Sequence, residues 1–356
     1  MCPVVVGSGF TPEGFDQNPV YYEVIQGAPW RSGPIVNMSQ WVVERAYRRY
    51  GILAHESPAV AQAWKLLEQS SYAEDLGVGD DTGVGQFPLV PASSYKRSLP
   101  HWNANLTRPS VGLCKTWAAW GLLIDASSEA SELVNSEPFR YDLVNTGREI
   151  LAEISTVFSI RFAQALDATP LDSAKINRTG QAYVELLIDL DQLVSTDSSF
   201  LLGPWLHDAR AWGTLNGSTM HDCTGTVIDS VIKGDCQRFL EWNARTQLTT
   251  WYPTIGPGEP MPLRDTDYAR KHWSPLIKDY YARRAAMLLA QALADADAGK
   301  PLDTTAVLRL RAQLAFEWTT RTDNYPKAPA PNSTGVAMAA RAKYAAMFTS
   351  CDTELP

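Results

Sequence analysis

The sequence lacks the patterns that mark metal, redox and nucleotide-binding proteins. Its five cysteines include no Cys-x-x-Cys pair, and its five histidines show no His-Glu-x-x-His or other metal-ligand spacing. The glycine pair Gly7 and Gly9 has neither the third glycine nor the following helix of a dinucleotide-binding fingerprint. We therefore expect no metal and no cofactor.

Strong positive charge and long apolar runs are also missing. The 356 residues carry a net charge of −8 with no basic block, so we expect no nucleic-acid partner. No apolar run is long enough to cross a bilayer, so we expect no membrane partner. The residues after Met1 do not form the basic and then apolar segments of a signal peptide.

Sequons for N-linked glycosylation, by contrast, are frequent. They take five of the eleven asparagines: Asn37, Asn105, Asn177, Asn216 and Asn332. Such sequons mark surface positions in chains of the secretory route, although a chain rich in Ser and Thr also produces some by chance. We expect glycosylation at all five positions. Because no signal peptide is present, we also expect that the true N-terminus is missing.

One cysteine pair can be proposed from its spacing. Cys223 and Cys236 enclose a short loop between two helical segments. In an oxidising compartment they are placed to pair, and closing such a loop would contribute about 3 kcal/mol in the chain-entropy model. Two unrelated thiols are the alternative. Whether Cys2, Cys114 and Cys351 pair is left open.

Helical periodicity dominates most of the chain. Ser57 and Pro58 form a helix start, and Gly51 can end the preceding helix. One apolar stripe comprises Phe139, Leu143, Ile150, Ile154, Phe158, Phe162 and Leu166. Further amphipathic runs cover 39–50, 57–72, 171–197, 200–213, 237–251, 267–299, 304–321 and 335–350. Residues 74–110, rich in Gly, Pro, Ser and Asp, predict a long irregular loop. The fold class is therefore mainly α.

The first residues differ from this pattern. Val4–Val6 favour a short strand, Gly7 and Gly9 end it, and Glu13 lies on the loop that follows. A loop just past a strand end is a common place for a catalytic carboxylate. A turn carboxylate that caps the next helix is the alternative, and Asp16 and Glu23 are neighbouring candidates.

Several long motifs resemble the eukaryotic lysosomal-type alpha-N-acetylglucosaminidases, a glycoside hydrolase family. They are "VGSGFTPEGFDQNPVYYEV", "WVVERAYRRYG", "FRYDLVNTGRE", "SFLLGPWLHDARAWG", "NARTQLTTW" and "DYARKHWSPLIKDYY", in the family's order. The resemblance covers nearly the whole chain. It implies that residues 1–35 are the end of a (β/α)₈-like catalytic barrel, with its last strand and catalytic loop, and that residues 36–356 are the all-α C-terminal domain. The missing N-terminal and barrel domains of the same enzyme would then be partners.

The resemblance also implies a reaction and a substrate. Glu13 would be the nucleophile of a retaining exo-glycosidase that removes terminal, non-reducing α-linked N-acetylglucosamine from glycans such as heparan sulfate. Retaining hydrolysis needs a second carboxylate, the acid/base, about 5–5.5 Å away. In the family that group lies on an earlier strand, outside this chain, so we expect the chain alone to be inactive. A lysosomal, vacuolar or secreted location follows.

Two aromatic residues match family positions that contact the sugar. They are Trp251 and Tyr268, and the intervening "YPTIGPGEPMPLRDT" is longer than the family's connection. A core aromatic at a helix end is the alternative for Trp251. Asn243, Arg245 and Gln247 also match and could simply hold their helix. The alternative function is a non-catalytic helical module that binds glycans or acts as a scaffold. The sequence leaves the oligomeric state open, a homo-oligomer included.

Overall fold

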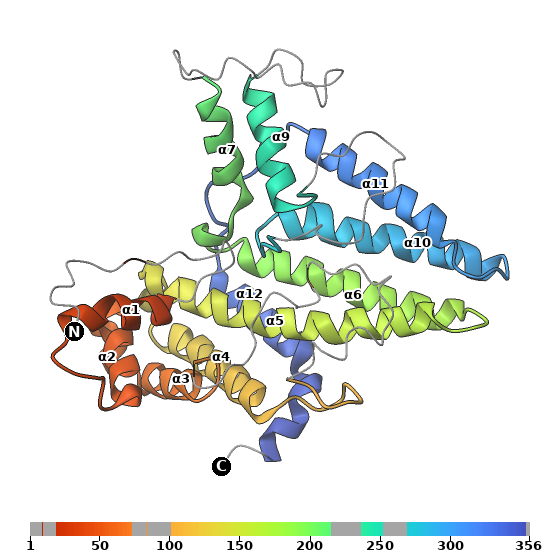
Figure 1. Cartoon of the computed structure of the whole chain (residues 1–356). Helices are drawn as coiled ribbons and strands as arrows, with labels where there is room; N and C mark the ends of the chain where they lie inside the picture. Colours follow the sequence, from red (N-terminus) through yellow and green to blue (C-terminus); the bar gives the residue numbers. More distant parts are fainter. Residues whose placement is uncertain are drawn as a thin grey trace, which may run out of the picture.

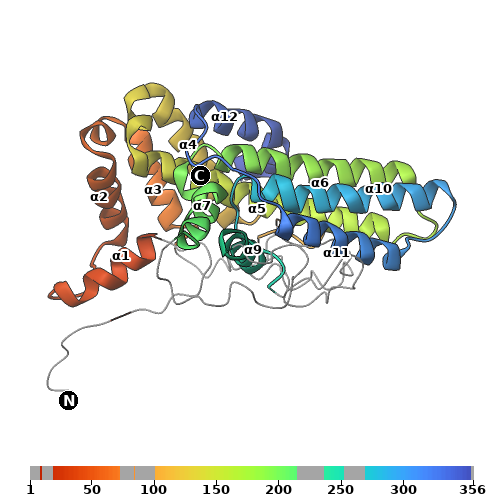
Figure 2. The same ribbon diagram turned by 90° about the horizontal axis from the view of Figure 1, so that it is seen from above.

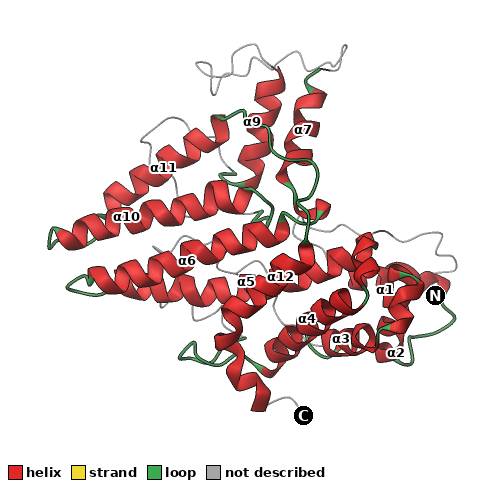
Figure 3. Ribbon diagram, turned by 180° about the vertical axis from the view of Figure 1, so that it is seen from behind, coloured by secondary structure: helices red, strands yellow, loops and turns green. Residues whose placement is uncertain are grey.

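The protein is an array of helices. The computed structural model describes residues 9, 19–72, 84, 101–214, 236–251 and 269–353 (Figure 1). Within these ranges there are helices, turns and two isolated β-bridges, Trp102 to Pro109 and Leu201 to Ser274, but no strand (Figure 3). The predicted mainly-α class is confirmed. The expected strand at 4–6 and the loop of Glu13 lie outside the described residues, so the barrel remnant stays a prediction.

The described helices have the following bounds. They are α1 (Pro19–Gly27), α2 (Met38–Tyr50), α3 (Pro58–Glu68), α4 (Val111–Glu129), α5 (Glu137–Leu166), α6 (Ser173–Val194), α7 (Leu202–Trp212), α9 (Cys236–Leu248), α10 (Arg283–Asp297), α11 (Thr304–Thr320) and α12 (Ser333–Tyr344). Shorter turns are η1 (Ala28–Trp30), η2 (Ile52–Glu56), η4 (Ser131–Asn135), η5 (Ser198–Phe200), η6 (Ile277–Ala282) and η7 (Ala345–Thr353), of which η6 is π-helical. None of the described helices is both long and apolar enough to cross a membrane.

Helices α5 and α6 form the centre of the array. They lie side by side, α10 packs on α6, and α11 follows α10 (Figures 1 and 2). Helices α2, α3 and α4 pack in sequence at one end, and α12 contacts α4, α5 and α6. Helices α7 and α9 pair with each other and stand across this layer (Figure 1). The start of α7 and the end of α9 thus meet the central layer.

The apolar stripe predicted for α5 faces this core. Phe139, Leu143, Ile150, Ile154, Phe162 and Leu166 are buried, and Phe158 is half-buried. Gly147 lets the Trp120 ring approach the helix, because a Cβ there would lie 2.6 Å from that ring. The Trp120 indole donates to the carbonyl of Leu143. Side-chain size at one position therefore sets the distance between α4 and α5.

Several predicted helix ends are confirmed. Ser57 stands at the N-cap position of α3 with Pro58 in its first turn, as expected. Gly51 follows α2 with a φ of 86°, a backbone conformation that glycine adopts readily. Asn37 and Asn332, both of which belong to sequons, cap α2 and α12 by accepting backbone N–H groups with their side-chain oxygens. The local patterns therefore located the starts of these helices to within one or two residues.

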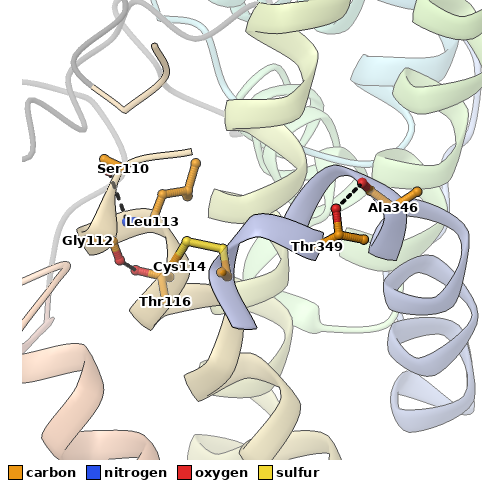
Figure 4. Close-up of a disulfide and its surroundings, with 8 residues drawn as sticks. Ser110, Gly112, Leu113, Cys114, Thr116, Ala346 and Thr349 are labelled. Carbon is orange, nitrogen blue, oxygen red and sulfur yellow. Dashed lines mark hydrogen bonds between the residues drawn. A yellow bond between two sulfur atoms is a disulfide. The ribbon is translucent and has the colours of Figure 1, made fainter. Parts of the chain in front are cut away.

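A disulfide answers one question that the sequence leaves open. Cys114 in the first turn of α4 is bonded to Cys351 in η7, across 237 residues of chain (Figure 4). The Phe348 ring stacks on Trp117 beside it at 4.1 Å. Cys236 is also disulfide-bonded. Its partner lies outside the described residues, as Cys223 does, so the Cys223–Cys236 pair stays a prediction that non-reducing peptide mapping would test.

Candidate functional site

The structure describes one of the three predicted site residues. Trp251 follows the end of α9, whereas Glu13 and Tyr268 lie outside the described residues. The site is therefore built outward from Trp251 and from the elements that hold α9.

Trp251 has an unusual backbone and an exposed ring. Its φ is 57°, a left-handed value that costs a non-glycine residue roughly 1–2 kcal/mol. Its N–H donates to the carbonyl of Thr246 at 2.8 Å, which closes the end of the helix. The side chain is 49% exposed, far more than a core aromatic. Backbone strain of this kind concentrates at functional sites.

Helix α9 is fixed by a buried carboxylate between two guanidinium groups. Glu241 accepts hydrogen bonds from Arg210 of α7 at 2.6 and 2.8 Å and from Arg245 at 3.0 and 2.8 Å. The bond to Glu241 raises the pKa of Arg210. Arg245 is completely buried and donates to the carbonyl of Trp318 in α11 at 3.3 Å. Both charges of Arg245 and Glu241 are thus paired, and α9 is locked to α7 and α11.

The segment 269–275, which follows Tyr268 in the chain, is held from three sides. His272 Nδ1 lies 2.9 Å from a guanidinium nitrogen of Arg148 on α5. Because a guanidinium only donates, Nδ1 accepts and the ring proton resides on Nε2. The backbone of Ser274 exchanges hydrogen bonds with Phe200 and Leu202 at the start of α7. Three of the quoted motifs therefore meet at this segment, which joins α5 to the start of α7.

A buried carboxylate supports the same segment from α6. Asp191 accepts the Ser274 hydroxyl and the backbone N–H of Lys278, each at 3.0 Å. Burial raises the pKa of Asp191 to about 6. The Asp191 carboxylate thereby caps the first turn of η6.

An aromatic pair flanks α9 and was not predicted. The Trp205 indole donates to the carbonyl of Ala244 at 3.3 Å and lies 6.0 Å from the Trp273 ring. The Lys271 ammonium lies over Trp273 at 5.6 Å. Trp205 is 41% exposed. Both tryptophans belong to quoted motifs, so the sequence carried this signal, but not the proximity of the two rings.

Two further carboxyl groups on α5 have raised pKa values. Burial, followed by the nearby charge of Glu149, raises the pKa of Glu153 to about 8. Burial also raises the pKa of Asp142, which accepts the Tyr50 hydroxyl at 2.7 Å. Within the described part of the chain no group of His, Cys, Asp and Glu side chains could hold a metal ion. The described part of the site therefore offers carboxyl groups that bind protons and the exposed aromatic rings of Trp205 and Trp251.

The sequon asparagines that the structure describes are exposed. They are Asn37, Asn105, Asn177 and Asn332. Asn216 lies outside the described residues. Glycosylation stays a prediction at all five positions.

Comparisons with known proteins give a family. The model of the alpha-N-acetylglucosaminidase (NAGLU) C-terminal domain matches residues 41–343. The chain is 30% identical to alpha-N-acetylglucosaminidase from Homo sapiens over 341 residues, which are 96% of this chain and 40% of that protein. The chain therefore spans about two-fifths of the human protein's length.

Solved structures share the fold. A family 89 glycoside hydrolase from Clostridium perfringens, in complex with 2-acetamido-1,2-dideoxynojirmycin, matches 92% of this chain and 34% of its own with a TM-score of 0.66 and 18% identity. A double glutamate-to-glutamine variant from the same organism, in complex with its substrate GlcNAc-alpha-1,4-galactose, matches 91% and 33% with a TM-score of 0.64 and 20% identity. At such identity the likeness concerns the fold alone.

Proposed function

Because the chain belongs to the alpha-N-acetylglucosaminidase C-terminal domain family, we propose that it is the C-terminal part of a retaining exo-glycosidase. The substrate would be terminal, non-reducing α-linked N-acetylglucosamine on glycans of the heparan sulfate type. The observation that carries the proposal is the match to the human enzyme over 96% of this chain. The activity that the human relative's name states supports the reaction type.

Glu13 would attack the anomeric carbon, and the acid/base would come from the part of the enzyme that this chain does not span. One carboxylate cannot serve as the ionised nucleophile and as the protonated acid at once. The chain by itself would therefore be inactive. A lysosomal or secreted location is supported by the Cys114–Cys351 disulfide, since such bonds persist in oxidising compartments.

Trp251 would form the sugar-facing edge of the helical domain, with Tyr268 beside it. A pyranose offers a C–H face to a flat aromatic ring and hydroxyl groups to polar atoms. The exposure of Trp251 and the locked end of α9 support this role. The pair of Trp205 and Trp273 offers further aromatic surface beside α9.

A chimera tests the proposal. The first three-fifths of the human enzyme would be joined to this chain, and hydrolysis of an aryl α-N-acetylglucosaminide would be measured. We expect turnover by the chimera, none by the chain alone, and loss of nearly all turnover in Glu13→Gln with little change in melting temperature. Turnover at the unchanged rate in Glu13→Gln would contradict the assigned nucleophile, and a folded but inactive chimera would contradict the catalytic proposal.

The second candidate is a non-catalytic helical module that binds glycans or acts as a scaffold. The exposed Trp205, its neighbour Trp273 and the cation of Lys271 favour it, because such a surface does not require a barrel. Here the chain alone would bind a glycan that ends in N-acetylglucosamine, and Trp205→Ala would weaken binding. Isothermal titration of the isolated chain separates the two candidates.

A further inference from the structure

A cavity lies at the start of α12, away from the site around Trp251. Its volume is about 530 Å³, within the range of roughly 300–1,000 Å³ typical of small-ligand sites. The end of η4, the first turn of α5 and the segment 329–334 form its walls. All residues of the sequon at Asn332, namely Asn332, Ser333 and Thr334, line it.

The backbone and the amide of Asn332 are already fixed at this cavity. Asn332 has a left-handed φ of 70°, which asparagine tolerates better than most residues. Its side-chain oxygen accepts the N–H of Gly335 at 3.0 Å and so caps α12. A Cβ on Gly335 would overlap the Asn332 amide, so this glycine is needed for the contact. The cap uses Oδ1 and leaves Nδ2, the atom that carries an N-linked glycan, uninvolved.

The walls match the chemistry of an N-acetylated sugar. Val134, Pro329 and Pro331 offer apolar surfaces for its C–H groups and its acetyl methyl. Asn135 and Arg140 offer polar groups to its hydroxyls and amide. The Arg140 guanidinium is held in place by the carbonyl of Val134 at 3.3 Å and by the buried Asp197 at 3.4 Å.

A buried hydroxyl adds a further polar group. Ser333 is only 4% exposed and lines the cavity. Its hydroxyl adds a donor and an acceptor to the polar groups of the wall.

We propose that the first N-acetylglucosamine of a glycan attached to Asn332 occupies this cavity. The bond forms between Nδ2 and the anomeric carbon of an oligosaccharide that a lipid-pyrophosphate donor supplies. Nδ2 loses a proton, the bond from the anomeric carbon to the phosphate oxygen breaks, and the lipid pyrophosphate leaves. The sugar joins the segment 329–334 to α5 and becomes part of the fold. This inference does not depend on the proposed catalytic function.

Native deglycosylation tests the proposal. The whole chain would be secreted from a host that performs N-glycosylation and treated, folded, with peptide:N-glycosidase F. Peptide mapping in ¹⁸O water would follow the conversion of each asparagine to aspartate. Because a seated sugar is released only after local opening, we expect release at Asn332 at least about tenfold slower than at the exposed Asn177. An unoccupied Asn332, or equal release rates, would overturn the proposal.

Variants distinguish the cavity from other sources of protection. Ala330 lines the cavity and is exposed, so Ala330→Phe should fill it and bring the release rate at Asn332 to that at Asn177. Ala330→Ser is the matched control and should stay slow. Persistent protection in Ala330→Phe would show that the sugar is not held in the cavity.

Thermal unfolding gives an independent readout. Asn332→Asp removes the glycan and keeps an N-cap oxygen, whose charge favours a helix start. We expect a lower melting temperature than that of the glycosylated chain. Asn177→Asp removes a glycan from the exposed face of α6 and should leave the melting temperature unchanged. An equal or higher melting temperature in Asn332→Asp would contradict the proposal.

Discussion

Two carboxyl groups with raised pKa values, the half-buried Glu153 and the buried Asp191, stabilise the fold more in acid than at neutral pH. Burial raises the pKa of Glu153 from 4.5 to about 8 and that of Asp191 from 3.8 to about 6. Between the unfolded and the folded pKa of each group, the folded state binds more protons than the unfolded state. The free energy of unfolding therefore falls as the pH rises from about 4.5 to about 8, and this part of the stability is fully present only below the unfolded pKa values.

The size of the effect follows from the pKa differences. One pKa unit corresponds to about 1.4 kcal/mol, so the shift of Glu153 sets an upper limit of about 5 kcal/mol. Asp191 adds an upper limit of about 3 kcal/mol, reached by pH 7. Helix α5 bears the larger cost, because burial and, second, the charge of Glu149 one turn away both disfavour ionised Glu153.

Urea unfolding followed by far-UV circular dichroism at pH 5, 6, 7 and 8 measures this dependence. We expect the free energy of unfolding of Glu153→Gln to match that of the parent chain at pH 5. At pH 8 it should be higher by about 2–4 kcal/mol. Glu44→Gln is the control, because its carboxylate is 52% exposed. A parent chain that gains stability from pH 5 to pH 8, or a Glu153→Gln variant with an unchanged slope, would refute the reasoning.

Three further predictions concern packing, a disulfide and the site. Gly203→Ala should cost about 1–3 kcal/mol, because its Cβ would overlap a backbone carbonyl, whereas Gly33→Ala meets open space and should be neutral in urea unfolding. The double variant Cys114→Ser, Cys351→Ser should lower the free energy of unfolding by up to about 5 kcal/mol, measured by urea unfolding against the disulfide-bonded parent chain. In the chimera, Trp251→Ala should lower kcat/KM by an amount that corresponds to about 1–3 kcal/mol of lost transition-state binding. Unchanged specific activity together with a much lower Tm would show that Trp251 has a structural role instead.

Local order was predictable because it depends on neighbours in the chain. The apolar stripe of α5 and the Ser57–Pro58 start of α3 follow from the period of a helix and the preferences of its first turn. The Cys114–Cys351 bond was not predictable, because 237 residues separate its ends and spacing carries no information over that length. Only the packing of α12 and η7 against α4 brings them together.

The sequence predicted site residues only at positions that match a motif of the family. Trp251 was located by its resemblance to a family position, and the structure adds its exposure and its strained backbone. The sequence pattern alone does not distinguish Trp205 and Trp273 from tryptophans of the core. Their proximity depends on the bridge between Leu201 and Ser274, which joins the start of α7 to a segment 73 residues later.

The residues that resemble the family mostly build a support. Arg245 is buried against Glu241, and His272 is bonded to Arg148, so neither side chain is available at the surface. These contacts lock α9 to α7 and α11, and they fix the segment after Tyr268 to α5, α6 and the start of α7. A support of this kind fixes the position of an exposed aromatic such as Trp251 without taking part in bond cleavage. The reaction itself would then depend on Glu13 and on a carboxylate beyond this chain, while the helices determine how the sugar is held.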